Sequence, residues 1–246
     1  AANNTAVGSS ALTANTTGAG NVALGAGSLD ANTTADNSTA VGYNSLSANT
    51  TGINNTGMGA FAMITNTTGA SNVAVGYASL AGNTIANNNT AVGYNSLTAN
   101  TTGPANTAIG QSALLSNTTG GKNIAVGYQA MNNNVDGDNC VAIGYQALYT
   151  QDPASNVDMY NVAVGHAAGA LITTATLNTL IGGLAGDALT IGNSNVAVGY
   201  NSLTTEVAGD RSTAIGVGAL ALQTNASTVD VYNTAMGYNA GAAVTT

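Results

Sequence analysis

The sequence has very little charge, little aromatic bulk and few residues that could cross-link the chain. Its 246 residues include no Trp, one Phe, two Pro and one Cys, and only 5% are charged. A single cysteine, Cys140, cannot form an internal disulfide. With only Lys122 and Arg211 basic and a net charge of −8, the chain lacks the positive charge that nucleic acids and anionic membranes attract.

Large apolar side chains are also too scarce for a thick globular core, although 44% of the residues are hydrophobic. This content does not fit a chain kept disordered by its charge, so we expect a thin, repetitive core. No apolar run reaches the length of a membrane span, and no basic signal-peptide region is present. Because the chain begins at Ala1 rather than at Met, we expect a segment of a longer fibre or a processed product.

The dominant feature of the sequence is an internal repeat. An aliphatic residue followed by glycine recurs with a 17-residue period, and two of the intervals carry a four-residue insertion. The fourteen repeat glycines are Gly8, Gly25, Gly42, Gly59, Gly76, Gly93, Gly110, Gly127, Gly144, Gly165, Gly182, Gly199, Gly216 and Gly237. Repeats of this length indicate a solenoid, in which each unit buries its apolar side against its neighbours.

A typical repeat is Asn89 to Ala105, which contains Asn-Thr-Ala-Val-Gly-Tyr-Asn-Ser-Leu and an Asn-Thr-Thr-Gly turn. Alternating small and aliphatic residues before the glycine predict a strand, followed by a corner, a second short strand and the polar turn. Four residues after the glycine, eleven repeats have Leu or Met. The other three have Gly169, Gly186 and Gly241, with Leu171, Leu189 and Val244 following them. We therefore predict an all-β parallel β-solenoid of fourteen 17-residue coils, two of them extended to 21, forming one repeat domain over residues 1–246.

Stacked coils turn each repeat position into a column of similar residues. The repeat glycines suit a corner with positive φ, or a place where another backbone comes too close for a Cβ atom. An Asn four residues before the glycine in eleven repeats predicts an amide ladder between coils. Cys140 interrupts this column, and we predict an internal ladder position for it rather than a reactive thiol.

The residue after the glycine is Tyr in seven repeats: Tyr43, Tyr77, Tyr94, Tyr128, Tyr145, Tyr200 and Tyr238. This column is either an aromatic ladder that stacks on sugars or on a partner surface, or a packing column that covers the thin core or forms a subunit contact. The lone histidine, His166, lies in the same column and is expected to be a packing or surface residue.

The Asn-Thr-Thr turns match the spacing of N-glycosylation acceptors and resemble the threonine arrays of ice-binding solenoids. Adjacent threonines point to opposite faces, however, so the turns are better explained as side chains that bond their own backbone. Asp136-Gly137-Asp138-Asn139 resembles a calcium loop but lacks the remaining ligands. No recurring acid/base pair is present, and we predict no catalytic residue, metal site or cofactor.

The two four-residue insertions end in similar sequences, around Asp158 and Tyr160 in one and around Asp230 and Tyr232 in the other. Insertions in solenoids form protruding loops that are often binding surfaces. The candidate surface contacts are therefore Asp158, Tyr160, Asp230 and Tyr232 together with Tyr43, Tyr77 and Tyr94. Wrapping of a subunit edge is the alternative role of the insertions.

The Asn-x-Ala-(Val/Ile)-Gly core of each repeat, as in Asn89 to Gly93, resembles the head repeats of YadA-like trimeric autotransporter adhesins. Similar repeats occur in phage tail-fibre and other virion proteins. The resemblance covers the whole chain, although its 17-residue repeat is longer than the usual head repeat. It implies a left-handed parallel β-roll, three chains per fibre, and attachment to a surface.

We therefore predict a non-enzymatic, homotrimeric fibre segment outside the cell, on a virion or a cell surface, that binds a receptor or glycan on a host or neighbouring cell. No nucleic-acid partner and no membrane insertion are expected. Few large apolar side chains per coil independently favour trimerisation, because packing three rolls together would bury what one roll cannot. The alternatives are a filament subunit that stacks end to end and an ice-binding solenoid.

Overall fold

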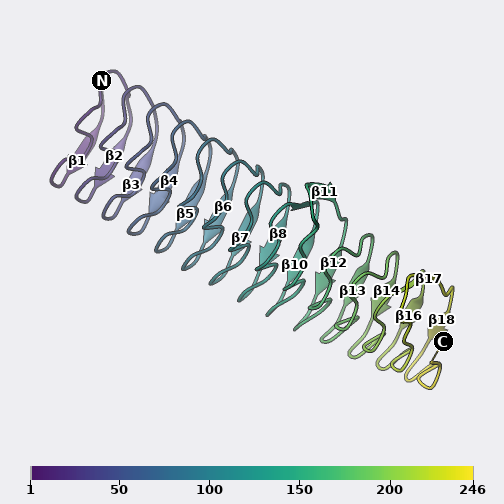
Figure 1. The fold of residues 1–246 in the computed structure, drawn as a ribbon. Coiled ribbons are helices and arrows are strands. Elements are labelled where there is room, and N and C mark those ends of the chain that lie inside the picture. Colours follow the sequence, from purple (N-terminus) through teal and green to yellow (C-terminus); the bar gives the residue numbers. More distant parts are fainter. Residues whose placement is uncertain (1, 246) are drawn as a thin grey trace. The chain divides into compact units, whose positions relative to one another are not determined.

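The computed structural model describes residues 2–245, which contain no helix and form a parallel β-solenoid whose coils follow the sequence repeat. Two compact units, Ala1–Lys122 and Asn123–Thr246, make up the chain, and each is described by itself. Each unit has seven coils, and the strands of successive coils lie side by side within it (Figure 1). The predicted all-β solenoid is therefore confirmed.

In the first unit each coil contributes one three-residue strand. Successive strands pair in parallel without a shift in register, so that Ala91 lies opposite Ala108. The strands are β1 (Thr5–Val7), β2 (Val22–Leu24), β3 (Thr39–Val41), β4 (Thr56–Met58), β5 (Val73–Val75), β6 (Thr90–Val92) and β7 (Thr107–Ile109). Equal spacing of the repeats keeps every column continuous.

The second unit has the same design with two additions. Its main strands are β8 (Ile124–Val126), β10 (Val141–Ile143), β12 (Val162–Val164), β13 (Thr179–Ile181), β14 (Val196–Val198), β16 (Thr213–Ile215) and β18 (Thr234–Met236). At the insertions, β9 (Gly137–Asp138) pairs with β11 (Val157–Asp158), and β15 (Gly209–Asp210) pairs with β17 (Val229–Asp230). The four extra residues of each insertion therefore extend one edge of the coil.

The interior is thin and half polar. In a typical coil the buried residues are Asn89, Ala91, Ser96, Leu97 and Asn100, while the side chains on either side of Ala91 face outward. The Leu or Met after the corner is the one large apolar core residue of such a coil, and burying it stabilises the fold by about 1.5–3 kcal/mol. Hydrogen bonds among the buried amides must supply much of the remaining specificity.

Left-handed backbone occurs at several positions of each coil. At the repeat glycine Gly93, φ is +134°, and a Cβ atom there would lie 2.6 Å from the carbonyl oxygen of Gly110. Glycine is therefore required at Gly93 both by the positive φ and by the close approach of the next coil's backbone. The buried Leu97 has φ of 52° and Asn95 also has φ of 52°, although neither is glycine. The predicted second strand is wrong, because these left-handed residues bend the segment after the corner.

In two coils of the second unit the core leucine is absent and other apolar residues fill its place. Gly169 and Gly186 replace the core leucine, and a Cβ atom on Gly169 would lie 2.7 Å from Cδ1 of Leu180. Leu180 and Ile172 are fully buried and occupy the volume that the missing leucine leaves. Leu171, expected to follow Gly169 into the core, is 51% exposed, so the correct compensating residue is Ile172.

Candidate contact surfaces

The outer face of the main strands leaves a row of apolar side chains partly exposed. We call the first and third residues of each three-residue strand the outer sheet face; they are Thr, Val, Ile, Leu and Met, with no charged residue among them. In the first unit Val7 is 57% exposed and Ile109 is 40% exposed, and the intervening residues of this face are all at least partly exposed. Contiguous exposed apolar surface of this kind marks an interaction site.

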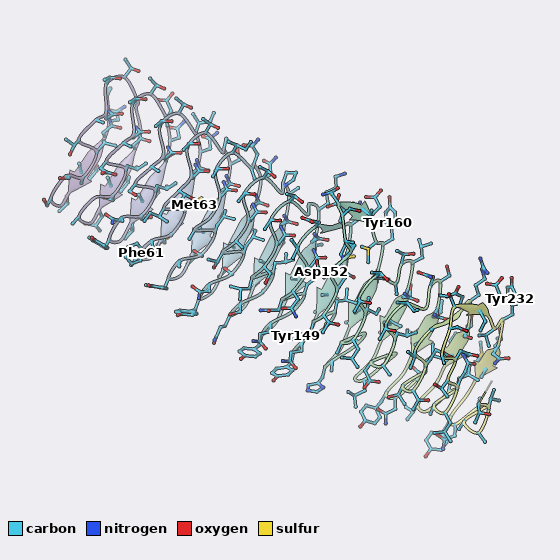
Figure 2. The ribbon with its side chains drawn as sticks, viewed as in Figure 1. Phe61, Met63, Tyr149, Asp152, Tyr160 and Tyr232 are labelled. Carbon is cyan, nitrogen blue, oxygen red and sulfur yellow. The ribbon has the colours of Figure 1, made fainter. Side chains whose placement is uncertain are left out.

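The tyrosine column forms short aromatic stacks at the corner beside the outer sheet face. Tyr77 stacks on Tyr94 with ring centroids 5.4 Å apart, and Phe61 lies edge-on between Tyr43 and Tyr77. Phe61 follows Ala60 and therefore supplies the ring that its coil lacks at the tyrosine position; Figure 2 shows it projecting from the edge of the unit. The repeat pattern does not reveal this substitution, because Phe61 is shifted by one residue from the tyrosine position.

In the second unit Tyr145 stacks on both Tyr128 and His166, with centroids 5.3 and 5.1 Å apart. Sugars stack on ring faces, whereas in these columns each stacked face is turned toward the next ring. The geometry therefore favours edge contacts with a partner over sugar stacking. Tyr43 and Tyr200 are both 54% exposed, so these rings do not cover the core.

The strand Asn column (Asn4, Asn21, Asn55, Asn72, Asn89 and Asn106 in the first unit) links coils mainly through the backbone, although Asn72 Nδ2 also donates to Asn55 Oδ1 at 3.3 Å. Asn72 Nδ2 donates to the carbonyl of Ala86 at 2.8 Å, and Asn72 Oδ1 accepts the N–H of Asn89 at 2.9 Å. Each amide thus bonds mainly to the backbone of the following coil. Backbone pairing is preferred here because the left-handed corners leave turn carbonyls pointing inward.

The side-chain ladder occurs instead in the turn Asn column, which consists of Asn15, Asn32, Asn49, Asn66, Asn83, Asn100 and Asn117 in the first unit. Asn66 Nδ2 donates to Asn49 Oδ1 at 2.8 Å and to the carbonyl of Gly69 at 3.0 Å. Asn32, Asn49, Asn66, Asn100 and Asn117, each the start of an Asn-Thr-Thr turn, are fully buried. In the folded chain these acceptor sequences are therefore inaccessible to glycosylation, whereas the first of them, Asn15, is half-buried.

The turn threonines also use their hydroxyl groups between coils. Thr50 Oγ1 donates to the carbonyl of Thr67 at 3.1 Å, and Thr67 Oγ1 donates to that of Thr84 at 3.0 Å. The predicted bonds to the turn's own backbone are thus replaced by bonds to the next coil. Since the donors are engaged, this column does not present free hydroxyl groups to ice.

Cys140 lies in the strand Asn column of the second unit, where its backbone N–H donates to Asn123 Oδ1 at 3.0 Å. Its side chain is fully buried, and burial raises the pKa of the thiol to about 11. Gln151 Nε2 reaches the sulfur at 3.3 Å, and Gln151 Oε1 accepts from Asn161 at 3.0 Å. The small cysteine makes room for the long glutamine, and Ser212 and Gln223 form the same combination in the other extended coil.

The insertions place the predicted contact residues on one edge of the second unit. Tyr160 donates to Asp158 Oδ2 at 3.0 Å, and Tyr232 donates to Asp230 Oδ2 at 2.9 Å. Both tyrosines are exposed and lie on the same edge in Figure 2. Tyr160 OH has its pKa raised by the hydrogen bond to Asp158 and by its charge.

The two insertions differ in one partner. Asn139 donates to Asp158 in the first, whereas Arg211 forms an ion pair with Asp230 in the second and lies 5.8 Å from the ring centroid of Tyr232. Only the second insertion therefore neutralises its aspartate. Exposed pairs of this kind contribute little to stability.

Residues 2–245 contain no pocket, no group of three or more His, Cys, Asp or Glu side chains able to hold a metal ion, and no helix able to cross a membrane. Comparisons with protein-family models, with curated proteins and with solved structures give no match.

Proposed function

We propose that this chain is a structural segment of a homotrimeric fibre on a virion or a cell surface, outside the cell, and that it mediates attachment to a host or neighbouring surface without enzymatic activity. The resemblance to YadA-like head repeats and to phage fibre repeats supports this assignment. So does the coil design, in which most backbone hydrogen bonds and many side-chain hydrogen bonds link one coil to the next.

The outer sheet face is the observation that carries the proposal. It is uncharged on a chain of net charge −8, so copies can approach one another there without charge repulsion. Seven strands with two outward side chains each offer an area of the order of the roughly 800 Å² per partner that stable interfaces bury. The many Ala and Gly residues of the coil would permit close approach of three copies.

The oligomeric state tests the proposal directly. Sedimentation and small-angle scattering of the purified chain are expected to give an elongated trimer. Replacing Val75 and Val92, neighbours on the outer sheet face of β5 and β6, with Asp should convert the trimer to monomers, because each buried carboxylate would lack a partner. Thr68→Asp and Thr102→Asp, at exposed turn positions, form the matched control and should leave the trimer intact.

Compact monomers of the unchanged chain would refute the fibre assignment. Open-ended polymers that grow with concentration would instead favour the filament subunit, in which copies stack coil on coil. Thermal hysteresis at high concentration would favour ice binding, for which the first threonine of each turn, whose hydroxyl bonds the next coil, offers little support.

Attachment is assigned to the exposed insertion tyrosines and to the ring edges of the tyrosine column. Binding of the fluorescently labelled chain to candidate host cells should fall several-fold when Tyr160 and Tyr232 are both replaced by Ala. Tyr43→Ala with Tyr94→Ala tests the corner column in the same way. Unchanged binding in both double variants would show that attachment lies elsewhere.

A further inference from the structure

A buried carboxylate in the second unit has a set of contacts unlike that of any equivalent residue. Glu206 occupies the turn position at which most coils have Asn, and its side chain is fully buried. The nearest charged residues on the elements around it are engaged elsewhere: Asp210 accepts from Asn193, Arg211 pairs with Asp230, and Asp187 accepts from Thr204. No ionisable side chain contacts Glu206 in the described part of the chain.

Six hydrogen-bond donors surround this carboxylate. Oε1 accepts the backbone N–H groups of Val207 at 3.0 Å, Ala208 at 3.1 Å and Gly209 at 2.7 Å, all in its own turn. From the following coil, Oε1 also accepts the N–H of Asn225 at 3.0 Å, while Oε2 accepts from Gln223 Nε2 at 2.8 Å and Asn225 Nδ2 at 2.9 Å. The negative charge is thus balanced entirely by amide dipoles.

These donors belong to two segments, so the carboxylate joins them. Gln223 and Asn225 begin the second insertion, and their contacts hold its first residues against the coil that contains Glu206. At its other end the insertion is held by the exposed Arg211–Asp230 pair and by the pairing of β17 with β15. The buried contacts of Glu206 are stronger than the exposed ion pair, because charge-assisted hydrogen bonds gain strength away from water.

The first insertion offers an internal comparison at the equivalent coil. Asn134 stands in place of Glu206, and Gln151 donates to its Oδ1 at 3.1 Å. Pro153 stands in place of Asn225 and has neither a backbone N–H nor a side-chain amide to donate. The charged clamp is therefore specific to the second insertion.

We propose that Glu206 is an acid-labile latch that holds residues 224–232 against the coil, so that acidification releases this loop. The latch stands independently of the fibre assignment and would regulate whether the contact residues Asp230 and Tyr232 are held in place. Protonation removes the charge that six donors share and turns one oxygen into a donor facing other donors.

The direction of the pH effect follows from the folded state. Burial raises the pKa of Glu206, but the hydrogen bonds from Gln223, Gly209 and Asn225 outweigh it, so that the pKa lies below the usual 4.5. The latch is therefore fully formed above pH 4.5. Below this pH, opening becomes up to tenfold more favourable per pH unit until the lowered pKa is reached.

Hydrogen exchange followed by mass spectrometry tests the latch, with peptides covering residues 224–232 compared with 152–160. In the unchanged chain, exchange of 224–232, corrected for intrinsic rates, should accelerate as the pH falls from 7 to 3. In Glu206→Gln the segment should already exchange at least about tenfold faster at pH 7 and lose most of its pH dependence. Asn225→Ala, which removes one donor, should shift the acid transition to higher pH.

Asp230→Asn serves as the control for the exposed ion pair and should keep the acid transition. Protection of 224–232 that does not change down to pH 3, or a transition abolished by Asp230→Asn alone, would overturn the proposal. Should Glu206→Gln fail to fold, the shift in Asn225→Ala decides: an unshifted transition counts against the latch.

Discussion

At the residue scale, the repeat glycines lie where the backbone of the next coil leaves no room for a Cβ atom. Gly182 has φ of +135°, and a Cβ atom there would lie 2.5 Å from the carbonyl oxygen of Gly199. The adjacent Gly183 has ordinary φ, and its nearest neighbour would be Tyr200 Cδ2 at 3.4 Å. A side chain would therefore clash with the next coil at Gly182, whereas Gly183 has room for a Cβ atom.

Gly182→Ala should destabilise the chain by about 3 kcal/mol or more, because it combines a left-handed backbone with a clash against backbone that cannot move freely. Gly183→Ala should change stability by less than about 0.5 kcal/mol. Urea unfolding followed by circular dichroism measures both values. Equal effects of the two substitutions would contradict this account of the corner.

Cys140 should be unreactive while the chain is folded. A pKa of about 11 against 9.0 for a free thiol lowers the thiolate fraction about 100-fold at pH 8, and burial adds to this. Labelling with a chromogenic disulfide reagent should be slow in buffer and fast in denaturant. Rapid labelling of the folded chain would show that the strand Asn column opens at this coil.

At the element scale, a row of buried amides holds the turns of successive coils together. Asn66 donates to Asn49 and Gly69 and accepts from Asn83 at 2.6 Å, so that one side chain serves three coils. Buried amides that lose a partner are costly because water cannot replace it.

Asn66→Ala should therefore lower the free energy of unfolding by about 2–4 kcal/mol, since amide groups of Asn49 and Asn83 each lose a partner. Thr68→Ala, in the same turn but exposed, is the matched control and should cost less than about 0.5 kcal/mol. Urea unfolding of both variants gives the comparison. A difference below about 1 kcal/mol would mean that the ladder is not a main source of stability.

The extended coils show how an element accommodates extra residues. In both extended coils a strand residue shorter than the usual Asn contacts a turn residue longer than the usual Asn. The pairs are Cys140 with Gln151 and Ser212 with Gln223. In each case the glutamine side chain accepts a hydrogen bond from the strand Asn of the following coil, which is Asn161 or Asn233. Sequence alone marked Cys140 as an interruption of the Asn column but did not identify the glutamine that compensates for it.

At the scale of the whole molecule, stability should be close to a sum over coils and their interfaces. Deleting residues 60–76 joins Gly59 to Tyr77, removes one complete coil of the first unit and preserves every column. We expect this variant to fold, with a far-UV circular dichroism spectrum per residue like that of the unchanged chain.

Deleting residues 61–76 instead leaves Ala60 in front of Tyr77, so that one coil has 18 residues. We expect this variant to be less stable than the 17-residue deletion, because the extra residue lies at the corner and displaces the side chains of that coil from their columns. If both deletions fold equally well, the columns do not determine the register.

Much of the fold was predictable because a repeat imposes one solution on every coil. The period identified the solenoid, the corner glycines and the ladder position of Cys140. The segment after each corner was predicted wrongly as a strand, since nothing in residues such as Leu97 or Asn95 signals a left-handed backbone. That conformation is enforced by hydrogen bonds to neighbouring coils, which local preferences do not contain.

The amino-acid sequence was enough to establish the number of coils, their register and the residues that form each column. The reason is that each residue stacks on the equivalent residue of the next repeat. The direction in which each column points emerges only in the folded coil. The strand aliphatics face outward and the turn asparagines face inward, contrary to their polarity. The physical reason is that a narrow coil must first satisfy its own buried carbonyl groups, and amides do this whereas valines cannot.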